Sequence, residues 1–339
     1  MARSILVVRL GALGDLVHAL PAVAALRAAW PDARIDWLVD ARYAEVLALV
    51  PILDRVVVVG ARGGASVVGV LRSLRRARYD VAIDFQGLLK SAALARVSGA
   101  RDVVGFATAQ LRERAAGVFY TTRVQADDTG HVIRKNLSLA RALGVTADVI
   151  DCPLTAALTP KLAEARRLLG LGDAGALAII NPGAGWPNKQ WPSDRYGAVA
   201  AHLAERHGLP TLVTWGPGER DLAERVAGAS HGAARVAPAT SVGELAALAN
   251  AAAVFVAGDT GPMQLAAAMG TPVVGVFGPT NPARNGPWAG EDVCVSRFDE
   301  CECHHKRRCR RPTACIETIT IPEVIDAVDR RLANRGARG

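Results

Sequence analysis

The chain has 339 residues, of which 50% are hydrophobic and 21% are charged. This composition excludes an intrinsically disordered protein, and at about 150 residues per domain the length predicts two domains. The 40 basic residues exceed the 32 acidic ones, so the net charge of +8 favours anionic partners: phosphates, nucleic acid or an anionic membrane surface.

No membrane span is predicted, because the longest uncharged stretch, residues 260–283, is broken repeatedly by glycine and proline. Arg9 and Asp15 interrupt the apolar start of the chain before it reaches the length of a signal-peptide core. We therefore expect a cytoplasmic protein, in which clustered cysteines bind a metal or stay free rather than form disulfides.

Short β-branched runs alternate with Ala- and Leu-rich runs through the first half of the chain. This alternation predicts a parallel sheet that helices cover on both faces. The expected strands are residues 5–10, 34–39, 55–59 and 80–85, and the expected helices are residues 16–30, 43–50, 67–77 and 88–97.

The same alternation restarts after a looser region at residues 148–160. The expected strands are residues 176–181, 211–215, 253–257 and 273–277, and the expected helices are residues 195–206, 221–227, 242–251, 262–269 and 322–332. We therefore predict two doubly wound α/β domains, over residues 1–160 and 161–339.

Ligands of open α/β sheets bind at the carboxyl ends of the strands, so the loops at these ends are candidate sites. The first loop holds Gly14 and Asp15 but lacks the GxGxxG dinucleotide fingerprint. Glycine permits a close backbone approach to a ligand, and Asp15 is expected either to cap the following helix or to act in catalysis. Residues 84–91 are typical of a strand-ending turn, although their polar groups could also bind an acceptor.

Two glycine-rich loops occur in the second half. One, residues 181–192, carries Gly185 and Lys189, and the other carries Asp259, Thr260 and Gly261 at the start of a predicted helix. Backbone N–H groups in such loops bind anions, and a lysine adds a positive charge. The pair favours a nucleoside diphosphate over the alternatives of a packed loop and a simple helix cap. The GxxxxGK[ST] pattern of a P-loop is missing.

Cysteines are concentrated in a third loop, where His304 and His305 lie among them. Thiolates and imidazoles at such short spacing suit zinc or iron, although the Cys-x-Cys start differs from paired CxxC motifs. The interleaved basic residues could instead contact phosphate, lipid headgroups or RNA, and a solvated loop with incidental thiols is the remaining alternative. The four candidate metal ligands are Cys301, Cys303, Cys309 and Cys315.

Nearly the whole chain resembles the ADP-heptose:lipopolysaccharide heptosyltransferases, the bacterial glycosyltransferase family 9. The resemblance rests on VVRLGALGDLVHALPA, DFQGLLKSA, NPGAGWPNKQWP and GDTGPMQLAAAMGTPVVGVFGPTNP. It implies the GT-B fold, in which two Rossmann-like domains face a cleft. DFQGLLKSA, Gly105–Phe106, Arg112–Glu113, Phe119–Tyr120 and His131-x-x-x-Lys135-Asn136 are most similar to heptosyltransferase I, whereas the cysteine-rich loop is more similar to heptosyltransferase II.

The resemblance implies a role for each candidate residue. Asp15 matches the proposed general base that deprotonates the acceptor hydroxyl, and Lys189 matches the lysine that contacts the donor diphosphate. Domain closure would bring Asp15 together with Lys189 and Gly261. We count Gly14 and Gly185 among the ligand-binding residues, because they allow the backbone to come close to a bound group.

The remaining family roles concern the donor. Asp259 matches the aspartate near the donor sugar hydroxyls, and the backbone of Thr260 and Gly261 matches the phosphate-binding segment. Glu219 matches a ribose-binding glutamate. Gln264 stands where the family often has histidine, and it can still hydrogen-bond sugar or phosphate.

The implied function is inverting transfer of heptose from ADP-heptose to a Kdo-type sugar of lipid A. No catalytic metal is expected, and a metal held by the cysteines would be structural. The expected acceptor is an anionic, lipid-linked saccharide at the inner leaflet, so we expect peripheral attachment to the inner membrane and no nucleic-acid partner.

Three alternatives remain open at this point. The first is a transferase of the same fold with another nucleotide sugar or another acceptor: a heptosyl-core sugar, another glycan or a protein. The second is a two-domain binding protein of the periplasmic type. The third is a nucleic-acid-binding module centred on residues 301–311, which leaves both glycine-rich loops without a function.

Overall fold

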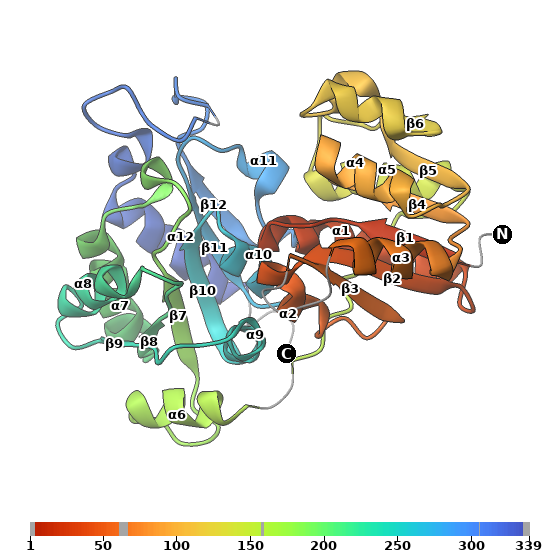
Figure 1. Cartoon of the computed structure of the whole chain (residues 1–339). Coiled ribbons are helices and arrows are strands. Elements are labelled where there is room, and N and C mark those ends of the chain that lie inside the picture. The colour runs from red at the N-terminus through yellow and green to blue at the C-terminus, as the bar shows by residue number, and fades with distance from the viewer. Residues whose placement is uncertain (1–3, 61–66, 157–158, 305, 335–339) are drawn as a thin grey trace. The chain divides into compact units, whose positions relative to one another are not determined.

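The computed structural model describes residues 4–60, 67–156, 159–304 and 306–334. The chain divides into two compact units, residues 1–155 and 156–339, and each contains a six-stranded parallel sheet (Figure 1). The predicted α/β class is confirmed. Within the described residues, no helix combines the length and the apolar character that crossing a membrane requires.

The first unit is built on the sheet β3-β2-β1-β4-β5-β6. Its central strand is an uninterrupted apolar run that is almost wholly buried, as expected for a parallel strand covered on both faces. The strands are β1 (Ser4–Val8), β2 (Arg34–Asp40), β3 (Arg55–Val59), β4 (Val81–Asp84), β5 (Asp102–Phe106) and β6 (Thr122–Val124). The helices are α1 (Leu13–Ala29), α2 (Ala44–Leu47), α3 (Val67–Ala77), α4 (Leu89–Val97) and α5 (Val132–Ala142), with 3₁₀ turns η1 (Ala41–Tyr43), η2 (Thr108–Gln110) and η3 (Arg114–Phe119).

The second unit repeats the arrangement with the sheet β12-β11-β10-β7-β8-β9. The strands are β7 (Leu177–Asn181), β8 (Thr211–Val213), β9 (Ala234–Val236), β10 (Ala252–Gly258), β11 (Val273–Phe277) and β12 (Val293–Ser296). The helices are α6 (Pro160–Leu168), α7 (Ser193–His207), α8 (Arg220–Gly228), α9 (Val242–Ala251), α10 (Gly261–Ala268), α11 (Pro282–Asn285) and α12 (Ile321–Ala333), with 3₁₀ turns η4 (Pro187–Lys189) and η5 (Cys315–Thr318).

Both sheets have the Rossmann strand order 3-2-1-4-5-6. Successive strands are added to one side of β1 and then, from β4 on, to its other side. In the second unit the same reversal occurs between β7 and β10. Right-handed crossovers therefore place helices on both faces of each sheet, and the loops after these four strands flank the two crevices. This topology brings the predicted loops together in pairs.

Two expected elements are shorter in the structure. The strand predicted at residues 5–10 ends at Val8, although the Arg9 N–H still donates to the Leu38 carbonyl oxygen of β2, and the Leu10 N–H donates to Gln86 in the loop after β4. Of the helix predicted at residues 43–50, only α2 (Ala44–Leu47) forms, directly after the 3₁₀ turn η1.

Candidate functional site

The crevice of the first unit is lined by the loops that follow β1 and β4. Arg9 joins them, since one guanidinium nitrogen donates to the Phe85 carbonyl oxygen at 2.5 Å and another lies 2.5 Å from the Asp15 carboxylate. The backbone N–H of Leu10 donates to Gln86 Oε1 at 2.8 Å. Two of these contacts fix the loop that carries Asp15 to the loop after β4, and the Arg9–Asp15 ion pair lies within the first loop.

Asp15 lies in the first turn of α1, where its carboxylate accepts a hydrogen bond from the backbone N–H of Ala12 at 3.2 Å. Its side chain keeps 44% of its accessible surface, whereas that of Arg9 keeps 14%. Burial raises the pKa of the Asp15 carboxyl, but the charges of Arg9 and His18 and the Ala12 hydrogen bond together hold this pKa below its usual value. Asp15 is therefore ionised at neutral pH, caps its helix and remains open to a ligand.

Asp84, at the end of β4, is buried and holds the turn that follows the strand. Its fully buried carboxylate accepts hydrogen bonds from the Tyr120 hydroxyl at 2.7 Å and the Ser91 hydroxyl at 2.8 Å, and from the backbone of Gln86 at 2.8 Å. Burial raises the pKa of this carboxyl. These bonds form the strand-ending turn that the sequence predicts, and Lys90 is exposed on the following helix.

The crevice of the second unit holds a close ion pair. Lys189 Nζ lies 2.6 Å from Asp259 Oδ2, and the two side chains keep only 14% and 11% of their accessible surface. The ammonium also lies 4.5 Å from the ring centroid of Trp186. Residues 70 positions apart thus meet where the loops after β7 and β10 lie side by side. A lysine ammonium has three N–H donors, so it can hold Asp259 and still bind an anion.

Glycines allow these loops to approach one another. A Cβ atom on Gly258 would lie 3.1 Å from the Lys189 carbonyl oxygen, and one on Gly183 would lie 2.1 Å from Glu219 Oε2. Glu219 also accepts a hydrogen bond from the Gly216 N–H at 3.0 Å. The Glu219 carboxylate is therefore held against the loop that carries Lys189. This position is compatible with a nucleotide-binding residue at the crevice.

The remaining expected ligand residues differ in their surroundings. Thr260 caps α10 through a 3.5 Å bond from the Met263 N–H, and Gly261 begins the helix, so the first-turn N–H groups form an anion-binding end. Gln264 is buried and donates to the Asn285 carbonyl oxygen at 2.5 Å. Gly14 lies inside the first turn of α1, and a Cβ atom on Gly185 would meet no atom within 4 Å.

Two groups of side chains could hold a metal. The four cysteines of residues 301–315 pack against one another. The His304 ring contacts the backbone rather than the cysteines, since its Nε2 lies 2.7 Å from the Phe298 carbonyl oxygen. His305 lies outside the described residues. The second group is His202, His207 and Asp329, which joins α7 to α12.

In the second group, the Nε2 atoms of both histidines face one carboxylate oxygen. His202 Nε2 and His207 Nε2 lie 2.8 and 2.6 Å from the same oxygen of Asp329. We interpret this group as a helix–helix contact rather than a metal centre.

Comparison with known proteins identifies the family of the chain. The profile described as glycosyltransferase family 9 (heptosyltransferase) matches residues 67–315. The chain belongs to glycosyltransferase family 9. It is therefore a glycosyltransferase, as predicted, and this membership favours an enzyme over the binding-protein and nucleic-acid-binding alternatives.

The relatives of this family 9 member include curated proteins and solved structures. Lipopolysaccharide heptosyltransferase 1 of Pseudomonas aeruginosa is 31% identical over 253 residues, which cover 71% of this chain and 69% of that protein. Lipopolysaccharide heptosyltransferase 3 of Escherichia coli K12 is 27% identical over 62% of each chain. The structure of E. coli heptosyltransferase WaaC with ADP-2-deoxy-2-fluoro heptose has a TM-score of 0.74 and 25% identity, covering 96% of this chain and 99% of that one.

Two residues that organise the site were not predicted from the sequence. Arg9 pairs with Asp15, and the available signal was a charged residue that directly follows a buried strand. Asn188, next to Lys189, is buried and donates to the Lys306 carbonyl oxygen at 2.7 Å. Nothing in the sequence indicates this contact between residues 118 positions apart.

Proposed function

We propose that this glycosyltransferase transfers heptose from ADP-heptose to a Kdo-type sugar of lipid A, with inversion at the anomeric carbon. The observation that carries the proposal is the Lys189–Asp259 pair at the crevice of the second unit, where an ammonium lies beside the anion-binding end of α10. The second unit, with a boundary near residue 160, binds the donor, and the first unit, which carries Asp15, binds the acceptor.

The proposed reaction exchanges one bond at the anomeric carbon. The acceptor hydroxyl oxygen forms a bond to C1 of the heptose while the bond from C1 to the β-phosphate oxygen of ADP breaks. Asp15 takes the hydroxyl proton, and ADP leaves with the bonding electron pair. The pair of Asp15 with Arg9 keeps the base ionised before the transfer.

The donor residues stabilise the leaving diphosphate and position the sugar. Lys189 and the N–H groups that follow Thr260 neutralise the charge that develops on ADP. Asp259 accepts hydrogen bonds from heptose hydroxyls, and Glu219 accepts them from the ribose. Gln264 contributes through its remaining amide oxygen, which has no hydrogen-bond partner among the described residues. Gly14 and Gly185 leave room for the ligands to approach the backbone.

We further propose that catalysis needs no metal, because the lysine, the helix end and the carboxylate together supply the charge and the base that the reaction requires. A metal held by Cys301, Cys303, Cys309 and Cys315 is then structural.

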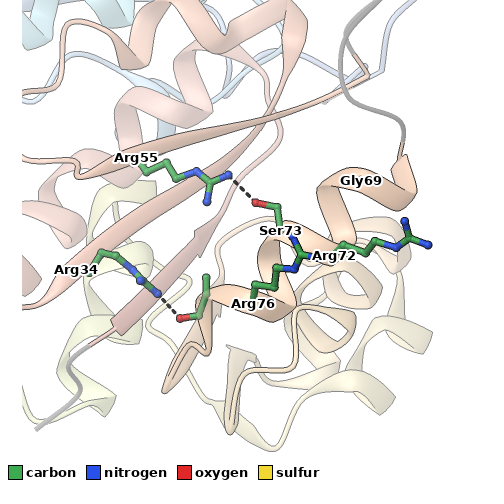
Figure 2. A pocket seen from close by; sticks show the side chains of 7 residues that line it. Arg34, Arg55, Gly69, Arg72, Ser73 and Arg76 are labelled. Carbon is green, nitrogen blue, oxygen red and sulfur yellow. Dashed lines mark hydrogen bonds between the residues drawn. The ribbon is translucent and has the colours of Figure 1, made fainter.

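A basic pocket supports attachment to an anionic membrane surface, the remaining part of the proposal. The side chains of four arginines line a cavity of about 450 Å³ in the first unit (Figure 2). Arg55 donates to the Ser73 hydroxyl at 2.6 Å, whereas Arg72 and Arg76 are exposed on α3. The four lining arginines are Arg34, Arg55, Arg72 and Arg76. Arg34 and Arg55 are the first residues of β2 and β3. The pocket therefore lies at the amino ends of these strands, whereas the Asp15 loop follows the carboxyl end of β1.

A panel of donors and acceptors tests the proposal. Purified protein is incubated with ADP-heptose, UDP-sugars or GDP-sugars and with Kdo-bearing lipid A, and the acceptor mass is measured. Heptose addition only with ADP-heptose supports the proposal. Transfer from UDP- or GDP-sugars but not from ADP-heptose would contradict the donor assignment.

The second candidate function is transfer of heptose to another acceptor, such as a heptose of the core. It is favoured by the similarity to a protein named heptosyltransferase 3, which indicates that acceptors differ within the family. The same panel separates the candidates when an acceptor that already carries heptose is included. Transfer only to that acceptor selects the second candidate.

A further inference from the structure

Four cysteine side chains meet in the loop between β12 and η5. Cys301, Cys303 and Cys315 are buried, and Cys309 is half-buried against them. Cys303 Sγ lies 3.1 Å from Cys309 Sγ, and the side chains of Cys315 and Cys301 hydrogen-bond to each other. The sequence spreads these sulfurs over 15 positions, and the fold gathers them into one cluster.

Each sulfur also accepts a backbone hydrogen bond. The N–H of Cys303 donates to Cys301 Sγ at 3.4 Å, and the sulfurs of the other three cysteines bond backbone N–H groups of residues 310, 311 and 316. Backbone N–H groups therefore point at the sulfur cluster from residues 303, 310, 311 and 316.

Basic side chains surround the four cysteines. The loop carries the cationic side chains of Lys306, Arg307, Arg308, Arg310 and Arg311, of which Arg311 pairs with the Glu302 carboxylate. A divalent metal with four thiolates has a net charge of −2, which offsets part of this positive charge. Four sulfurs in a closed set are the ligands of structural zinc and of mononuclear iron sites.

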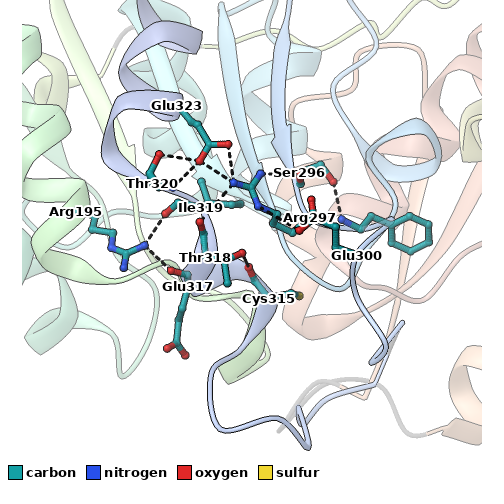
Figure 3. A network of polar contacts seen from close by, with 11 residues as sticks. Arg195, Ser296, Arg297, Glu300, Cys315, Glu317, Thr318, Ile319, Thr320 and Glu323 are labelled. Atoms are coloured by element: carbon teal, nitrogen blue, oxygen red, sulfur yellow. Dashed lines mark hydrogen bonds and ion pairs between the residues drawn. The ribbon is translucent and has the colours of Figure 1, made fainter.

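The loop is bonded to the segment that carries Lys189. Asn188 donates from Nδ2 to the Lys306 carbonyl oxygen at 2.7 Å. Beyond the last cysteine, Trp191 Nε1 donates to the Ile319 carbonyl oxygen at 3.0 Å. Figure 3 shows Arg195, which donates to the Glu317 carbonyl oxygen at 2.6 Å. Contacts thus run from inside the cysteine loop, and from the turn that follows it, to residues 188–195.

We infer that Cys301, Cys303, Cys309 and Cys315 bind one zinc or iron ion, and that this ion positions Lys189 through the Asn188–Lys306 hydrogen bond. Binding releases the thiol protons and changes no oxidation state. The inference about Lys189 rests on its proposed role at the donor diphosphate. Asn188 is a positioning residue, since it acts through the lysine beside it.

Elemental analysis of the purified full chain tests the metal site. We expect one zinc or iron per chain, and we expect Cys303→Ser to lose it. Cys152→Ser and Cys294→Ser are matched controls that keep the metal, because these cysteines lie outside the cluster. A chain without stoichiometric metal, or with a Cys303–Cys309 disulfide by non-reducing mass spectrometry, would overturn the site.

Titration calorimetry with ADP tests the positioning. Asn188→Leu is close to asparagine in size, removes the N–H donor and adds no charge. We therefore expect full metal content and an ADP dissociation constant raised about tenfold, as for one weakened contact to a charged group. In the Lys189→Ala background, Asn188→Leu is expected to have no further effect. An equal loss in both backgrounds would overturn positioning through Lys189.

The controls separate this inference from the proposed function. If Lys189→Ala leaves ADP binding unchanged in the metal-loaded protein, the diphosphate role and the positioning of Lys189 are both wrong, while the metal site stands on its own elemental analysis. If Lys189→Ala weakens ADP binding but Asn188→Leu does not, only the positioning is wrong. Melting temperatures of all variants show that each one is folded.

Discussion

Asp15 is the residue on which the proposed chemistry depends most. Asp15→Asn keeps the size of the side chain and removes the base, so we expect kcat to fall by about 10² to 10⁴ while ADP affinity is unchanged. Initial rates of heptose transfer and ADP titrations measure the two effects.

The matched control for Asp15 is Asp194→Asn. Asp194 also lies in the first turn of a helix, α7, and is exposed, so its loss changes helix-dipole interactions without touching the site. Near-normal turnover of Asp15→Asn, or an equal loss in Asp194→Asn, would contradict a role as base.

Arg9 controls the ionisation of Asp15. In the folded protein its charge helps to hold the pKa of Asp15 below 3.8, so the carboxylate is lost only when the pH falls through this lowered value. Arg9→Gln removes the charge and raises the pKa, which moves the acid limb of the kcat/KM profile to higher pH. A pH–rate profile of transfer checks this. An unmoved acid limb would show that Arg9 does not tune the base.

The candidate residues could be predicted from loop motifs, but their contacts could not. Asp15, Lys189 and Asp259 follow strands and are recognisable by residue type and position. The pairing of Lys189 with Asp259 depends on the adjacency of β7 and β10, which a local pattern does not encode. Gln264 is predicted to bond sugar or phosphate, but the motif does not indicate that its amide nitrogen donates to the Asn285 carbonyl oxygen.

At the scale of elements, α12 is fixed by a charged cap (Figure 3). Glu323 accepts two hydrogen bonds from Arg297, at 2.6 and 2.7 Å, and one from the Thr320 N–H at 2.8 Å. These bonds lower the pKa of Glu323 from 4.5 to about 2. A lowered carboxyl pKa stabilises the fold above the unfolded value, and this stabilisation is lost as the pH falls from 4.5 towards 2.

We therefore expect Glu323→Gln to reduce the free energy of unfolding by about 1 kcal/mol at neutral pH, as for loss of a helix cap. The difference from the unmodified protein should shrink as the pH falls below 4.5. Urea denaturation at several pH values measures both effects. Glu224→Gln, at an exposed pair on α8, is the control and should change little. A pH-independent difference would contradict stabilisation by the ionised Glu323 carboxylate.

Most of the long apolar strands were predictable, including the edge strand β3, whereas the interior strand β5 and several short strands were not. The buried strands β1, β4, β7 and β10 are continuous apolar runs, so their sequences alone identify them. The short strands β6, β9 and β12 contain polar or half-buried residues and depend on pairing with a neighbour. Helices α5 and α6 were also not assigned, since their apolar residues are interrupted by several charged ones.

For the whole molecule, the net charge of +8 and the basic pocket predict binding to anionic membranes. We expect the protein to sediment with vesicles that contain anionic lipid, with binding that weakens as salt rises, and not with neutral vesicles. Exchange of both exposed pocket arginines, Arg72→Glu and Arg76→Glu, should reduce sedimentation. Arg220→Glu on α8 changes the charge by half as much and serves as the positional control.

Equal sedimentation with neutral vesicles, or unchanged binding of the pocket variant, would contradict attachment through this pocket. Free inorganic phosphate provides a further arm. If it competes with vesicles at low concentration, the pocket binds phosphate groups in general rather than a membrane surface.

In the proposed transfer, the base Asp15 belongs to the first unit and the donor residues belong to the second. The most direct measurement follows ADP release and acceptor mass together, with ADP-heptose and Kdo-bearing lipid A. The account predicts one ADP released for each heptose added, and no release without acceptor beyond slow hydrolysis. Acceptor that stays unmodified while ADP-heptose binds tightly would contradict it.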